Sequence, residues 1–191
     1  MLRIASIILA LSLSAATAFA GGLIYNVYIH PSYRPNDIAY AGGPGELWTE
    51  VIGNPFGAPQ ADFDRAVTSA MYGAHFGPAT KFTTLPGPAA RRAFHVRLMF
   101  NPPAMTNSTH ICTANPLFGP SVGAGAVRLS AAFCQDGEAL TFLQADGGRF
   151  SGPSDPRFRG FIRDVTMQLF PTQNNPELLR GNNGRCRFSN C

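Results

Sequence analysis

The fold is decided by AVRLSAAFCQDGEALTFLQ, residues 126–144, because this stretch predicts two neighbouring antiparallel strands. Residues 126–134 and 138–144 are dominated by apolar and β-forming residues, and they flank Gln135-Asp136-Gly137. An Asp-Gly pair between two such runs is a strong signal for a tight hairpin turn. We therefore expect the two runs to lie side by side in an antiparallel sheet.

A further strand is predicted by the sequence AFHVRLMF, residues 93–100, in which side chains of two kinds alternate. Successive side chains of a strand point to opposite faces of the sheet. One face is expected to carry Phe94, Val96, Leu98 and Phe100, and the other His95, Arg97 and Met99. Shorter β-rich runs at residues 24–29, 46–52 and 81–84 predict the rest of the sheet.

Two helices are predicted from apolar residues that recur with helical spacing. The first lies in residues 61–75, with its apolar stripe at Phe63, Val67, Ala70 and Met71. The second begins at Ser154-Asp155-Pro156, where a capping side chain precedes a proline that suits the first helical turn, and it ends before Pro171. Its apolar residues are Phe158, Phe161, Ile162, Val165 and Leu169.

This order of elements predicts a single α+β domain with a mainly antiparallel sheet of four to five strands. Both helices are expected to pack on one face of that sheet. We divide the chain into a signal peptide (1–20), an extended or loop lead-in (21–45), the α+β domain (46–171), and an Asn- and Arg-rich tail with two cysteines (172–191). The part that follows the signal peptide has the size of one ordinary domain.

The first twenty residues have the features of a cleaved export signal. Arg3 is followed by an uncharged apolar run, Ile4–Ala20, which ends in the small residues of Ala18-Phe19-Ala20. The alternative is an uncleaved anchor, which a run of this length would barely permit. We expect a periplasmic or secreted protein with no stable membrane insertion after signal removal. The strong excess of arginine over lysine favours a bacterial source.

Four cysteines follow the predicted signal, at Cys112, Cys134, Cys186 and Cys191. An even number in an oxidising compartment predicts two disulfides, for which three pairings are possible. We favour the local pairs, Cys112 with Cys134 and Cys186 with Cys191. A metal site or a redox pair is the rival interpretation, but the sequence has neither a C-x-x-C motif nor a Cys/His cluster.

Charge and motifs exclude several classes of function. The formal net charge is only +4 and no window concentrates it, so we expect no nucleic-acid binding. No phosphate loop, dinucleotide fingerprint or metal-ligand spacing occurs, and no cofactor is expected. Glu46 and Glu50 share one face of a predicted strand but stand too far apart for a glycosidase pair. We therefore assign no catalytic, cofactor-binding or metal-binding residue.

Four short motifs carry a resemblance to a known group of proteins. They are Val51-Ile52-Gly53-Asn54-Pro55-Phe56, Phe100-Asn101-Pro102-Pro103, Ala132-Phe133-Cys134 and Leu169-Phe170-Pro171. With these the chain resembles small exported proteins of alphaproteobacteria, a family known only as uncharacterised. The resemblance implies bacterial export and brings no catalytic residue with it, because the motifs are turns, a cysteine and a helix end.

Two functions remain as hypotheses. The first is a non-enzymatic binding or envelope-accessory module whose partner is an envelope protein. Its docking surface would include tyrosines that could equally cover the edge of the core, namely Tyr25, Tyr28, Tyr33 and Tyr40. The second is a small exported hydrolase with a dispersed site, formed by His95, Arg97 and a carboxylate from elsewhere in the chain. A hydrogen bond between His95 and a carboxylate in a concave pocket would favour the second hypothesis.

Overall fold

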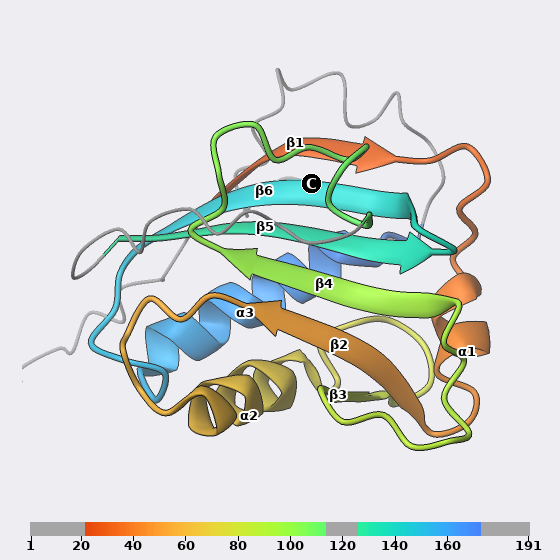
Figure 1. Ribbon diagram of the computed structural model, residues 1–191, viewed down its shortest axis with the longest axis horizontal. Coiled ribbons are helices and arrows are strands. Elements are labelled where there is room, and N and C mark those ends of the chain that lie inside the picture. Colours follow the sequence, from red (N-terminus) through yellow and green to blue (C-terminus); the bar gives the residue numbers. More distant parts are fainter. Residues whose placement is uncertain (1–21, 114–125, 173–191) are drawn as a thin grey trace, which may run out of the picture.

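The computed structural model describes residues 22–113 and 126–172 and forms an α+β fold. Its six strands make one sheet in the order β1-β6-β5-β4-β2-β3 (Figure 1). The elements follow one another as β1 (Leu23–Ile29), α1 (Asp37–Ala41), β2 (Glu46–Ile52), α2 (Gln60–Met71), β3 (Lys81–Thr83), β4 (Phe94–Phe100), β5 (Ala126–Gln135), β6 (Glu138–Arg149) and α3 (Pro156–Leu169).

The predicted hairpin lies inside this sheet, between β1 and β4. β5 and β6 pair antiparallel, and the turn between them consists of Asp136 and Gly137. Both turn residues have positive φ, 50° and 86°, as a turn matched to the twist of the strands requires. β5 also pairs antiparallel with β4, so the prediction is confirmed for this part of the sheet.

The expectation of a mainly antiparallel sheet of four to five strands needs correction. The sheet has six strands and is mixed, because β2 pairs in parallel with β4 on one side and with β3 on the other. The parallel pairing of β2 with β3 follows from their connection, since α2 lies between them in the chain and returns it to the starting end of the sheet. The described residues also contain a third helix, the short α1, within a segment expected to be loop.

α2 and α3 pack against each other on one face of the sheet, as expected (Figure 1). The predicted stripe of α2 is buried, and so are the five apolar residues predicted for α3. Aromatic rings from both helices and from β4 meet at the contact. The ring centroids of Phe63 and Phe100 lie 4.8 Å apart, and those of Phe63 and Phe158 lie 5.9 Å apart. This apolar layer leaves the other face of the sheet available for polar side chains.

The segment assigned as a lead-in, residues 21–45, contributes to the same core where it is described. β1 pairs antiparallel with β6, and Ile24, Tyr33 and Ile38 are each no more than 2% exposed. The hydroxyl of Tyr33 donates a hydrogen bond to the carbonyl oxygen of Pro171 at 2.9 Å. The described part of this segment therefore packs as one unit with residues 46–171.

Asp155 caps α3, and we expect Asp155→Ala to lower the free energy of unfolding by about 1–2 kcal/mol at neutral pH. The carboxylate accepts hydrogen bonds from the backbone amides of Arg157 and Ser151, each at 2.9 Å, and from the Arg157 guanidinium. The contact with Arg157 is the main reason why the pKa of Asp155 lies well below its usual value of 3.8. Urea unfolding of the two proteins measures the difference.

The pH dependence of this difference has a defined sign. Because the folded-state pKa of Asp155 is lowered, its stabilisation is complete above pH 3.8 and is lost as the pH falls below that value. The gap between wild type and Asp155→Ala should therefore narrow as the pH is lowered from about 4 towards 2. The control is Asp62→Ala, because Asp62 is an exposed first-turn acid of α2. A gap that stays constant with pH would contradict the prediction.

Candidate functional site

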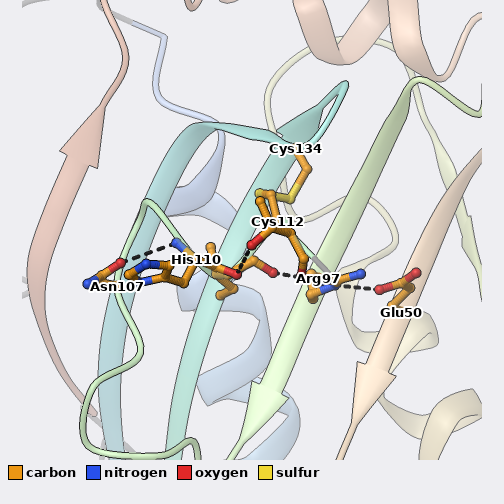
Figure 2. The surroundings of a disulfide bond; sticks show 8 residues. Glu50, Arg97, Asn107, His110, Cys112 and Cys134 are labelled. Atoms are coloured by element: carbon orange, nitrogen blue, oxygen red, sulfur yellow. Dashed lines mark hydrogen bonds and ion pairs between the residues drawn. A yellow bond between two sulfur atoms is a disulfide. The ribbon is translucent and has the colours of Figure 1, made fainter. Parts of the chain in front are cut away.

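The sheet face opposite α2 and α3 carries the polar groups that the sequence analysis singled out. β4 places His95 and Arg97 on this face, as predicted, and β2 adds Trp48 and Glu50 beside them. Residues that follow β4 cross over this face (Figure 1), and a disulfide joins them to β5 (Figure 2). We call residues 102–113 the braced loop, because three kinds of contact hold it to the sheet.

Arg97 supplies the first of these contacts. Its Nε donates to Oε2 of Glu50, which is its register partner on β2. Its Nη1 donates to two carbonyl oxygens of the braced loop, those of Ile111 at 2.8 Å and Thr113 at 2.9 Å (Figure 2). The Arg97 side chain is only 11% exposed and that of Glu50 is 21% exposed. The guanidinium therefore links two strands to the loop in a largely dry environment.

The second contact is the disulfide between Cys112 of the loop and Cys134 of β5. Both cysteines are buried, at 5% and 0% exposure. They belong to a small apolar cluster on this face, separate from the main core, together with Met99, Ile111, Ala132, Ala139 and Phe142. Cys186 and Cys191 lie outside the described residues, so the second predicted disulfide stays a prediction.

The third contact reaches strand β6. Nε2 of Gln144 donates to the carbonyl oxygen of Thr106 at 3.1 Å. Within the loop, Oδ1 of Asn107 accepts hydrogen bonds from the backbone amides of Thr109 and His110, which fixes a turn (Figure 2). The braced loop is therefore held to the sheet near its middle and at its C-terminal end. Sequence analysis missed this arrangement, because prolines and polar residues in this stretch indicate only a connection.

His95 lies on the same face but makes no such bonds. It is 7% exposed, and neither of its ring nitrogens has a hydrogen-bond partner among the described residues. Its ring packs on that of Trp48, with centroids 4.9 Å apart. Burial lowers the pKa of His95 from 6.5, Glu50 opposes this effect, and Arg97 adds to it. The net effect favours the neutral form of the imidazole more than in a solvated histidine.

The hydrolase hypothesis required His95 to bond a carboxylate. The structure does bring a carboxylate, Glu50, next to Arg97 and onto the strand beside His95. However, Glu50 is bonded to Arg97, and no hydrogen bond joins His95 to an acid among the described residues. The geometry that would favour a general base is therefore not formed here, and Arg97 is engaged in structural contacts.

A second histidine makes a contact that sequence analysis did not foresee. Nδ1 of His30 lies 2.6 Å from the hydroxyl of Ser32, the distance expected of a nucleophile and its base. The same nitrogen also accepts the backbone amide of Ser32 at 3.1 Å, and the serine is exposed at a turn. A third group that orients the histidine is not found in the described part of the chain. The pair therefore serves as a turn contact.

The four tyrosines proposed as a docking surface do not lie together. Tyr33 is buried in the core, and burial raises the pKa of its hydroxyl. Tyr25 and Tyr28 lie on β1, whereas Tyr40 lies on α1 and packs against Phe94 at the start of β4. β6 and β5 separate β1 from β4 in the sheet. The assignment of all four to one surface is therefore wrong.

Comparison with known proteins adds no relationship. No family model, no curated protein and no solved structure matches the chain. Within residues 22–113 and 126–172, no group of three His, Cys, Asp or Glu side chains could hold a metal ion. No helix in the same residues is both long and apolar enough to cross a membrane.

Proposed function

We propose that this protein is an exported binding module of the bacterial cell envelope and that the braced loop is its recognition element. One observation carries the proposal. Arg97, the Cys112–Cys134 disulfide and Gln144 hold the loop on the sheet, while its outer side chains remain free for contact. Rigid scaffolds that position an exposed loop are a common basis of recognition.

The exposed side of the braced loop has the composition of a small recognition surface. Met105 is 83% exposed, and Asn107, Thr109 and His110 are exposed beside it. A flexible apolar side chain among polar neighbours suits a protein partner, because methionine adapts its shape to the surface it meets. The disulfide supports an oxidising compartment, in keeping with the apolar N-terminal segment.

The binding test compares two exposed apolar residues, one that precedes β4 in the chain and one that follows it. Met105→Ser removes the apolar contact of the braced loop, and Leu85→Ser is the matched control, because Leu85 is 86% exposed. We expect tagged wild-type protein to capture one stoichiometric protein from crosslinked envelope extracts. Met105→Ser should weaken the affinity for that protein by about tenfold, which corresponds to about 1.4 kcal/mol. Leu85→Ser should leave it unchanged.

Two results would overturn the proposal. The first is equal binding by wild type and Met105→Ser, which would exclude the braced loop. The second is a cytoplasmic location, which cell fractionation would reveal. In that case thiol labelling of the unfolded protein should also show that Cys112 and Cys134 are free thiols. If no partner is captured and the pure protein instead hydrolyses a substrate, loss of that activity in His95→Gln would favour the hydrolase hypothesis.

A further inference from the structure

His95 is a buried titratable side chain that the proposed binding function does not use. It is 7% exposed, and both ring nitrogens lack a hydrogen-bond partner among the described residues. A buried polar group without a partner is costly, and the cost rises steeply when that group is charged. The packing therefore accepts the neutral imidazole and penalises the imidazolium.

Trp48 is the aromatic side chain that packs on His95. Its indole packs on the imidazole from the neighbouring strand β2, with ring centroids 4.9 Å apart. Trp48 is itself only half-buried, so its outer side already meets solvent. The Trp48 ring is therefore a side chain that can move without breaking the hydrogen-bonded ladder of β4 and β5.

Two charged groups act on His95, Glu50 on β2 and Arg97 on β4. Glu46, also on β2, is instead paired with Lys81, and Arg92 lies just before β4. The carboxylate of Glu50 favours the imidazolium, but it is already bonded to Arg97, whose own charge opposes a second cation. The guanidinium of Arg92 lies 5.8 Å from the centre of the Trp48 ring. On β5, the residue opposite His95 is Cys134, which does not titrate because it is in the disulfide.

We propose that His95 and Trp48 form a pH-sensitive switch, in which protonation of His95 displaces the Trp48 ring and opens this part of the sheet face to water. In the closed state the imidazole is neutral and dry. In the open state the imidazolium is hydrated. The switch rests on the packing of β2 and β4, goes beyond the proposed binding function, and does not depend on it.

The direction of the switch follows from linkage. Burial, the largest effect, lowers the pKa of His95 in the closed state below the value of 6.5 for a solvated histidine. The closed state therefore has its full stability above pH 6.5 and loses stability as the pH falls below it. For each unit by which the pKa of His95 differs between the closed and open states, protonation lowers the ratio of closed to open molecules about tenfold.

The test uses the fact that Trp48 is the only tryptophan of the chain. Its fluorescence is recorded from about pH 8 to about pH 5 under conditions in which far-ultraviolet circular dichroism shows that the fold is intact. We expect a red-shifted emission with a midpoint below pH 6.5, and the shift should be absent in His95→Phe, which keeps an aromatic ring against Trp48. His110→Gln is the control, because it removes an exposed histidine and should leave the transition unchanged.

A second measurement does not depend on the folding of a variant. Titration of the wild-type histidine ring signals by NMR gives the pKa of His95 directly, and the indole signal of Trp48 should move with the same midpoint. A pKa at or above 6.5 would overturn the switch. So would a Trp48 signal that is flat across the titration of His95, or a fluorescence transition that persists in His95→Phe.

Discussion

Replacing Arg97 with methionine is expected to lower the free energy of unfolding by about 3–5 kcal/mol. Methionine retains part of the side-chain volume but no donor. The carboxylate of Glu50 would lose its cationic partner, and the carbonyl oxygens of Ile111 and Thr113 would lose their hydrogen-bond donor. Since this environment is largely closed to water, the unpaired groups would keep much of their desolvation cost.

Two further variants show whether the loss of stability in Arg97→Met comes from the lost contacts of the guanidinium. Glu50→Gln keeps an oxygen acceptor for Arg97 and leaves both loop contacts in place, so it should destabilise the protein less than Arg97→Met. Arg159→Met changes an exposed arginine of α3 and should alter the free energy of unfolding by no more than about 0.5 kcal/mol. Urea unfolding measures all three. A loss below about 1 kcal/mol in Arg97→Met would mean that the guanidinium is not a structural brace.

The elements that were predicted correctly from the sequence are those determined by residues close together in the chain. The Asp136-Gly137 turn sets the hairpin with two residues, and the apolar stripe of α2 needs only four positions. The alternation in residues 93–100 likewise assigned the correct residues to each face of β4. In each case a few neighbouring side chains determine the backbone conformation, so no knowledge of distant residues is needed.

The candidate site depends on residues that are far apart in the sequence. Glu50 and Arg97 meet because β2 and β4 pair in parallel, an arrangement that the hairpin signals could not reveal. His95 was expected on a polar face, but the same face buries it. Its burial reflects Trp48 on β2 and Cys134 on β5, and both contacts follow from strand order rather than from any pattern around His95.

Loss of the Cys112–Cys134 disulfide is expected to lower the free energy of unfolding by about 3 kcal/mol. The bond closes a loop with a sequence separation of 22, and opening it gives the unfolded chain more conformations. The measurement uses a Cys186→Ala/Cys191→Ala background, in which Cys112 and Cys134 are the remaining cysteines. Urea unfolding with and without a reductant then reports on this bond alone, with both sulfur atoms still present.

Limited proteolysis of the same background protein locates the effect. Reduction should speed cleavage within residues 102–113, because the bond is one of the contacts that hold the braced loop to the sheet. Cleavage near Leu85, in the exposed connection before β4, should keep its rate. Equal stability with and without reductant, or no change in cleavage of the loop, would contradict a bracing role for the disulfide.

The disulfide and Arg97 should be energetically coupled, because both hold the same short segment. Cys112 lies between Ile111 and Thr113, whose carbonyl oxygens accept from Arg97. Once the bond is reduced, the loop can leave the sheet and expose those carbonyl oxygens to water. Arg97→Met then removes less stabilisation, because part of the contact with Arg97 is already lost. The loss caused by Arg97→Met should therefore be smaller in the reduced protein by about 0.5–3 kcal/mol, the range of coupling for contacts in one network. Strict additivity would mean that the two contacts stabilise separate parts of the fold.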